Sequence, residues 1–238
     1  MDDRLTLVLK GENCNGIASK DPRRLFATGR QDYLKKLVDH PHDHEPVADY
    51  LYKTLSDTLS SADYLFKESR RKFSTATYPN TELGKSLKTI ASLSFSEVNT
   101  RVYYVSLSSF NRHINEEAQQ KRLFNELNEA VAAFVKDIKS CGRFNNLLLF
   151  TFSKFDRRVN QNASGGTDHG TANNMFFISG ALQKKGLINA LPDLTNLENN
   201  DLKFSVDFRD VYQMVLKNWL QSDARNILGS DFSTLNIV

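Results

Sequence analysis

Residues 147–180 read LLLFTFSKFDRRVNQNASGGTDHGTANNMFFISG, and this stretch decides the fold that we expect. It begins with an aromatic and aliphatic run and ends with a second one, MFFISG, and both are typical of buried strands. The segment between them is poor in helix formers, rich in glycine and asparagine, and too polar for a core. We therefore expect two strands joined by a loop that presents Asp168 and His169.

Amphipathic helices are predicted on both sides of this stretch, because apolar residues recur there every three to four positions. The predicted helices lie within residues 40–73, with a helix start near Pro46, residues 77–98, residues 116–142 and residues 207–220. Asn80 or Thr81 is expected to cap the second helix and Asp207 the last one. Gly142 stands where a helix-ending glycine is expected. The expected inward faces are Val47, Leu51, Leu55, Leu59, Ala62 and Phe66; Leu83, Leu87, Ile90 and Ala91; Leu123, Leu127, Val131, Phe134 and Ile138; and Val211, Met214, Val215 and Leu216 or Trp219.

Two further apolar runs complete the predicted pattern. Residues 4–11, RLTLVLKG, alternate like a short strand, and residues 102–107, VYYVSL, are typical of a buried strand, whereas residues 12–26 are expected to form a loop. Strands that alternate with helices predict an α/β fold with a mainly parallel sheet flanked by helices, and we expect residues 1–238 to form a single α/β domain. Functional residues should then lie in the loops that follow the strands.

Composition excludes several classes of protein. The 238 residues include 31 basic and 28 acidic ones, a net charge of +3, which gives no electrostatic footprint for nucleic acid. Cys14 and Cys141 form neither a disulfide framework nor a metal knuckle. No apolar run is long enough to span a membrane, and the N-terminus does not resemble a signal peptide, so we expect a soluble chain without a membrane span.

The Asp168–His169 pair is a candidate metal site. Neighbouring residues usually point apart, but the glycines beside this pair permit a sharp bend. His113 follows the predicted strand 102–107, so it could join them around zinc or a similar divalent ion. The alternative is a polar loop in which Asp168 and His169 only hydrogen-bond the turn. A second histidine group, His40, His42 and His44 in HPHDH, is more typical of a solvated loop.

Other reaction classes lack their usual motifs. The sequence contains no G-x-x-x-x-G-K phosphate loop, no G-x-S-x-G nucleophile elbow and no dinucleotide fingerprint. Nucleotide hydrolysis, serine-esterase chemistry and hydride transfer therefore have no sequence support.

Three segments together resemble a known family. VYYVSLSSFNRH, the stretch from LLLFTF to FFISG, and DLKFSVDFRDVYQMVLKNWL are similar to the bacterial domain of unknown function 1501 family, with GGTDHGTA and DFRDVY as the most specific motifs. This family is grouped as sulfatase-like within the alkaline phosphatase superfamily. The resemblance implies an alkaline-phosphatase-like fold, of which this chain would be the C-terminal portion. It also implies hydrolysis of phosphate or sulfate esters at a two-metal site, and family members are often exported by the twin-arginine route.

The resemblance also implies roles for individual residues. Asp168 and His169 would bind a divalent metal such as zinc, manganese, calcium or magnesium, together with His113 and Asn111. Lys154, Arg157 and Arg209 would contact the substrate, a small anionic ester or glycan, or support the metal ligands. The chain departs from the family pattern at Asn111-Arg112-His113, where Asp-Thr-His is usual, and at SKFDRR, where SEFGRR is usual.

Two functions follow from these observations. One is a metal-dependent ester hydrolase, or the remaining part of one. The other is a catalytically inactive member that keeps the fold and binds a ligand or partner, because no activated serine or threonine is marked in the sequence. Ser164, Thr167 and Thr171 lie near the proposed metal ligands without a motif that would activate them.

Overall fold

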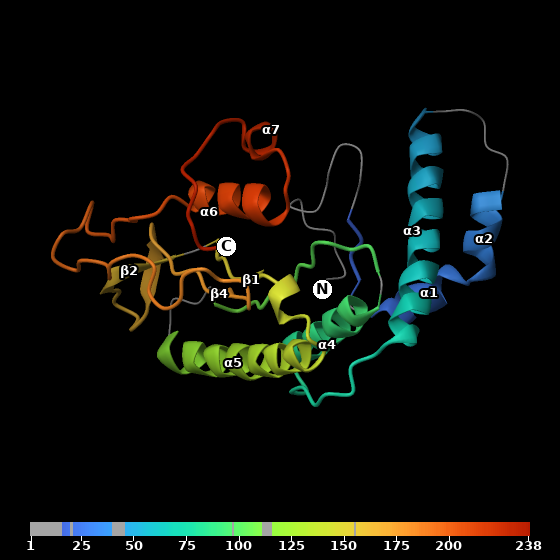
Figure 1. The fold of residues 1–238 in the computed structure, drawn as a ribbon, viewed down its shortest axis with the longest axis horizontal. Helices are drawn as coiled ribbons and strands as arrows, with labels where there is room; N and C mark the ends of the chain where they lie inside the picture. Colours follow the sequence, from blue (N-terminus) through green and yellow to red (C-terminus); the bar gives the residue numbers. More distant parts are fainter. Residues whose placement is uncertain (1–15, 20, 40–45, 97, 111–115, 155) are drawn as a thin grey trace. The chain divides into compact units, whose positions relative to one another are not determined.

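The computed structural model describes residues 16–19, 21–39, 46–96, 98–110, 116–154 and 156–238. It falls into two compact units, and each is described by itself (Figure 1). The first unit contains residues up to Ser108 together with Leu123–Cys141, and the second contains Ser109–Arg122 and Gly142–Val238. The predicted strand 4–11 and the histidines of HPHDH lie outside the described residues.

Helices α1 (Pro22–Gly29), α2 (Asp32–Asp39) and α3 (Pro46–Arg71) form one part of the first unit. The α1 and α2 helices both pack along α3 (Figure 1). The rings of Phe26 and Phe66 stack with their centroids 3.9 Å apart, which joins α1 to α3. Helix α1 corrects the loop expected over residues 12–26, because the Asp21 side chain caps it and proline follows at its first position.

The core of the first unit lies between α4 (Glu82–Phe95) and the larger part of α5 (Glu116–Ser140). The expected faces of both helices supply buried residues: Leu83, Leu87, Ile90 and Ala91 from α4, and Leu123, Phe134 and Ile138 from α5. The stripe predicted along α3 is buried only at Ala62, whereas Val47 and Leu51 are exposed. The periodicity therefore predicted each helix correctly, but it did not show which turns of α3 are covered.

A buried polar cluster joins the segment before α4 to α5. The carboxylate of Asp137 accepts hydrogen bonds from the hydroxyl groups of Ser74, at 2.5 Å, and Tyr78, at 2.7 Å. The backbone N–H of Ser74 also donates to the hydroxyl of Ser92 on α4. Burial, and then the hydrogen bond to the Asp137 carboxylate, raise the pKa of Tyr78 well above its usual range. This cluster joins three segments through side-chain hydrogen bonds.

The second unit contains two small antiparallel sheets. Strands β1 (Leu149–Phe150) and β4 (Phe177–Ile178) pair with each other, and strands β2 (Asp156–Gln161) and β3 (Thr167–Gly170) form a hairpin between them in the chain. The hairpin reverses the chain, so the run that follows it returns antiparallel to the run that precedes it. A parallel pair would need a crossover, which is usually a helix, and the described residues between β1 and β4 contain none.

These pairings differ from the strands that the sequence suggested. No strand is assigned at residues 102–107 within the described part of the chain, and only residues 149–150 and 177–178 of the other two expected runs are paired there. The described pairs are antiparallel, so the mainly parallel, alkaline-phosphatase-like sheet remains a prediction.

Helix α6 (Phe208–Met214) continues into a π-helical turn, η3 (Val215–Trp219), and a short helix α7 (Ala224–Leu228) follows. Met214, Val215 and Ile237 form a buried cluster, which also contacts Phe150 of β1 and Phe177 of β4. The side chain of Gln213 exchanges two hydrogen bonds with the backbone of Phe232, which anchors α6 to the C-terminal segment. Together these contacts form the core of the second unit.

None of the described helices combines the length and the apolar composition that a membrane span needs.

Candidate functional site

The candidate site lies on the β2–β3 hairpin, which carries the Asp168–His169 pair. Asp156 pairs with Gly170 and Arg157 with His169, and the register shifts between Arg157 and Gln161. A side chain added at Gly170 would meet the backbone of Arg157 at 2.6 Å, so glycine is required there by the close approach of the two strands.

Asn162 builds the turn that joins the two strands. Its side-chain oxygen accepts hydrogen bonds from the backbone N–H groups of Ser164, at 3.0 Å, and Gly166, at 3.1 Å. Its own backbone N–H donates to the carbonyl of Gly166 at 2.8 Å. Gly165 has a φ of 71°, a conformation that glycine adopts without strain. The glycines of the opening motif therefore shape this turn, and β3 begins only after it.

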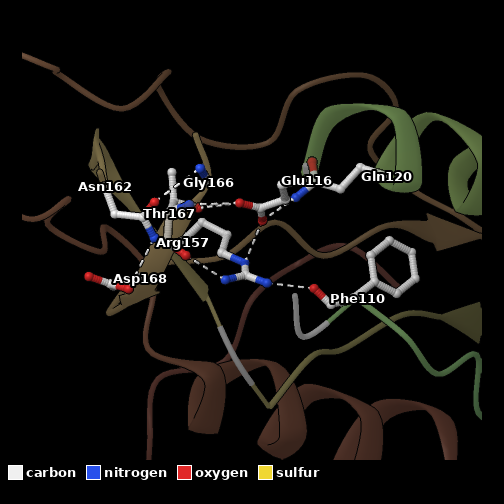
Figure 2. Close-up of polar contacts among 8 residues, drawn as sticks. All are labelled: Phe110, Glu116, Gln120, Arg157, Asn162, Gly166, Thr167 and Asp168. Carbon is white, nitrogen blue, oxygen red and sulfur yellow. Dashed lines mark hydrogen bonds and ion pairs between the residues drawn. The ribbon is translucent and has the colours of Figure 1, made fainter. Parts of the chain in front are cut away.

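A buried ion pair lies behind the hairpin and fixes its position (Figure 2). Glu116, the first residue of α5, accepts from Arg157 Nε at 2.8 Å through Oε1. Its Oε2 accepts from both the backbone N–H and the hydroxyl of Thr167, each at 2.8 Å. The two remaining guanidinium nitrogens of Arg157 donate to the carbonyl oxygens of Thr167, at 2.7 Å, and Phe110, at 2.5 Å.

The side-chain amide of Gln120 also donates to Glu116 Oε1. We call Glu116, Arg157, Thr167, Phe110 and Gln120 together the Glu116 network. The side chains of Glu116 and Arg157 are 8% and 21% exposed, so both charges are largely removed from water. Such a pair is stable only if nearly all of its hydrogen-bonding capacity is used, which is the case here. The position of Glu116 in the first turn of α5 further favours its negative charge.

Asp168 and His169 lie at successive positions of β3, and both are exposed. Successive side chains of a strand point to opposite faces. His169 is therefore on the face of Thr167 and its cross-strand partner Arg157, and Asp168 is on the other face. Figure 2 shows Asp168 pointing away from the Arg157 guanidinium, with its carboxylate 3.4 Å from the side-chain amide of Asn162.

This geometry bears on whether the predicted ligands fit one metal ion. On a regular strand, Asp168 and His169 can contact a single ion only if the backbone changes conformation. No group of three or more histidine, cysteine or acidic side chains is placed to hold a metal within the part of the chain that the structure describes. Asn111 and His113 lie outside that part, so the complete predicted set remains a prediction.

The other predicted site residues lie in different surroundings. Lys154 is exposed on the segment before β2. Arg157 belongs to the Glu116 network, where all three of its guanidinium nitrogens have protein partners. Arg209 forms a two-pronged pair with Asp207 at the start of α6, and its guanidinium lies 4.8 Å from the centre of the Phe232 ring. The described contacts of Arg157 and Arg209 thus support local structure.

The other face of the hairpin has a different electrostatic character. By strand alternation it carries Asp156 and Arg158, and Arg158 Nε lies 4.0 Å from the buried carboxylate of Asp201. One carboxylate oxygen of Asp156 is buried without a hydrogen-bond partner among the described residues. Burial, and then the nearby Asp201 charge, raise the pKa of Asp156 above its usual range, although a hydrogen bond from Asn173 opposes this shift.

Sequence reasoning did not identify Glu116, Asp156 or Asp201 as part of this region. In the sequence, Glu116 stands at the predicted start of a helix. The helix dipole favours an acidic residue at this position, and such a residue can bind an arginine. Asp201 carried another signal, because Glu198-Asn-Asn-Asp201 has the residues of a tight turn with two positive φ angles. Neither signal shows which distant segment the carboxylate will meet.

Comparisons with known proteins give one family and no individual relative. No curated protein and no solved structure matches the chain. A family model described as protein of unknown function (DUF1501) matches residues 54–227, which is well over half of the chain and includes the hairpin and α6. The chain therefore belongs to the DUF1501 family of proteins of unknown function.

Proposed function

We propose that this chain is a ligand-binding member of a sulfatase-like family, and that it binds a small ester or glycan without hydrolysing it. The observation that carries the proposal is the arrangement of β3, which directs Asp168 and His169 to opposite faces of a rigidly held hairpin. Two exposed polar groups on a fixed support suit recognition of a ligand. Hydrolysis by the superfamily mechanism would need both groups at one metal beside an activated nucleophile.

The hydroxyl groups near the pair support the same proposal. The Thr167 hydroxyl donates to Glu116, and the Thr171 hydroxyl donates to the carbonyl of Leu202 at 2.9 Å. The Glu116 carboxylate also accepts hydrogen bonds from Arg157 and Gln120, so its oxygens are occupied by structural partners. Both hydroxyls thus donate to acceptors that hold the hairpin in place.

Metal-dependent hydrolysis of phosphate or sulfate esters is the second candidate. It is favoured by the exposure of Asp168, a carboxylate of the kind that magnesium, calcium, manganese and zinc all accept. In that case Asp168 would hold the metal with His113 and Asn111, and His169 would join them only after a change in β3. The metal would supply a Lewis acid that polarises the ester oxygen.

Turnover and metal binding separate the two candidates. The full chain should be assayed with para-nitrophenyl sulfate and para-nitrophenyl phosphate, with and without zinc or manganese, while calorimetry measures binding of each metal alone. We expect no metal-dependent release of nitrophenol above the rate with metal and buffer. Saturation-transfer NMR on the same two esters and on neutral monosaccharides should detect binding of at least one of them.

Matched variants make the outcome specific. Asp168→Asn removes the proposed metal ligand, and Asp231→Asn removes an exposed carboxylate that pairs with Arg225 elsewhere in the second unit. Metal-dependent turnover that Asp168→Asn abolishes and Asp231→Asn leaves intact would show that the chain is a hydrolase. Absence of both turnover and ligand binding would contradict the ligand-binding proposal itself.

A further inference from the structure

A cavity of about 330 Å³ lies in the second unit at the base of the β2–β3 hairpin. We call it the Asp201 cavity, and it is lined by Arg158, Thr171, Glu198, Asn199, Asp201, Leu202 and Phe204. Its volume is at the lower end of the roughly 300–1,000 Å³ that small-molecule sites occupy, so it suits one ring-sized ligand. Asp168 and His169 are not among its lining residues.

We infer that the Asp201 cavity binds a neutral monosaccharide unit, whose hydroxyl groups meet the carboxylates and whose C–H face packs on Phe204. The inference rests on the proposed ligand-binding function, and it assigns a neutral sugar to a cavity that Asp168 and His169 do not line. Three features of the cavity favour such a ligand: the rigidity of one wall, the charge of the lining and one exposed aromatic ring.

The wall that carries both acidic residues is a tight turn. Glu198 and Asp201 exchange two backbone hydrogen bonds of 2.9 Å each, and Asn199 and Asn200 between them have φ angles of 52° and 63°. Asparagine is among the few residues that adopt this left-handed conformation readily. The Thr171 hydroxyl ties the same segment to the end of β3 through the carbonyl of Leu202. The backbone that carries the two acidic residues is therefore held in place before any ligand arrives, which lowers the entropic cost of binding.

The charges of the lining disfavour an anionic ligand. Glu198 and Asp201 contribute two negative charges and Arg158 one positive charge, and Asp156 lies close enough to Asp201 for their charges to interact. A sulfate or phosphate group would be repelled by this set, and Arg158 opposes a cationic amine. A hydroxyl group supplies the hydrogen-bond donor that carboxylates require without adding a charge.

The aromatic and donor groups complete the match to a sugar ring. Phe204 is 64% exposed beside the half-buried Leu202, so its ring offers an apolar surface at the cavity. The side chains of Asn199 and Arg158 add donors at the edge for ring and hydroxyl oxygens. A pyranose presents C–H groups on its faces and hydroxyl groups around its rim. Its apolar and polar groups are therefore distributed in a way that complements the ring of Phe204 and the polar lining of the cavity.

The test is ligand binding by the full chain and three variants. D-glucose, D-galactose and D-mannose are the probes in saturation-transfer NMR, and isothermal calorimetry gives the dissociation constant of the probe with the strongest signal. We expect Glu198→Gln to weaken binding about tenfold, which corresponds to one charge-assisted hydrogen bond. Phe204→Ala should weaken it by at least about threefold and reduce saturation of the ring C–H protons.

Phe208→Ala is the matched control, because Phe208 is similarly exposed but does not line the cavity. Unchanged binding in this variant, with circular dichroism confirming that each variant is folded, would support the inference. Failure of all three sugars to bind, equal binding by all variants, or preferential binding of inorganic sulfate or propylamine would overturn it. None of these results depends on turnover of esters, so the inference and the proposed lack of hydrolysis can fail separately.

Discussion

The two faces of the β2–β3 hairpin differ in how completely their polar groups are used. On one face, both oxygens of Glu116 and all three guanidinium nitrogens of Arg157 have protein partners. On the other face, a buried oxygen of Asp156 has none among the described residues, and Arg158 is half exposed at a cavity. The difference teaches that contacts within the protein use the polar groups of the first face, whereas the second face adjoins the cavity that we propose as a ligand site.

The largest expected effect on stability comes from replacing Arg157, and the neighbouring Arg158 on the other face provides the comparison. Arg157→Leu leaves the buried Glu116 carboxylate without its cation, and we expect a loss of about 3 kcal/mol in the free energy of unfolding. Arg158→Leu removes a half-exposed arginine whose Nε lies 4.0 Å from Asp201, at the limit of an ion pair, and should cost no more than about 1 kcal/mol. Urea denaturation, with hydrogen exchange at residues 156–170, measures both. Equal losses in the two variants would contradict the distinction between the faces.

The buried polar cluster around Asp137 in the first unit allows a second test of a buried, hydrogen-bonded carboxylate. Tyr78→Phe removes one of its donors and should cost about 1.5 kcal/mol at neutral pH. Because the folded state raises the pKa of Tyr78, it keeps the phenolic proton at a pH where the unfolded state loses it, at about 10 and above. The contribution of Tyr78 to stability is therefore present below about pH 10 and is lost as the pH rises further.

Denaturation of wild type and Tyr78→Phe at about pH 8 and about pH 11 measures this dependence, because the two values lie on either side of the usual tyrosine pKa. The stability difference between them should shrink at the higher pH. A difference that stays constant or grows would show that the Tyr78 hydroxyl does not depend on its proton for this contact.

The sequence predicted the helix caps and helix ends well, because these depend on contacts between residues that are close together in the chain. The Thr81 side chain caps α4 by accepting from the N–H of Gly84 at 3.1 Å, and Asp207 caps α6 by accepting from Arg209. Gly142, placed after α5, has the expected positive φ of 69°. Each of these contacts joins residues within a few positions of each other, so residue type and spacing were sufficient.

Pairings between distant segments could not be predicted in the same way. The β1 and β4 runs have the composition of buried strands, but composition does not encode direction, and the hairpin between them decides that they pair antiparallel. Glu116 and Thr167 are 51 positions apart, and only the folded chain brings them together. The sequence predicted the Asp–His pair on a glycine-rich loop, whereas the structure places it on β3 of a hairpin. The sequence assigned no role to Glu116, Asp156 or Asp201.

A smaller effect on stability is expected from Asp156, which has a buried carboxylate oxygen without a hydrogen-bond partner among the described residues. Its raised folded-state pKa means that the contribution of Asp156 to stability is fully present below the usual aspartate pKa of about 4, and is lost as the pH rises through the folded value. Asp156→Asn should therefore raise the melting temperature slightly at neutral pH, and this gain should disappear in acid. Asp231→Asn, which removes an exposed carboxylate, serves as the control for general charge effects. A lower melting temperature for Asp156→Asn at neutral pH would show that this carboxylate stabilises the fold.

A matched pair of substitutions tests the division between the two faces most directly. Glu116→Gln and Glu198→Gln make the same chemical change in the Glu116 network and in the Asp201 cavity, and each variant is measured both by urea unfolding and by its affinity for the best-bound of the three sugars. We expect Glu116→Gln to lower stability while the folded protein keeps wild-type affinity, and Glu198→Gln to weaken binding about tenfold at unchanged stability. Loss of affinity in Glu116→Gln with none in Glu198→Gln would contradict the account.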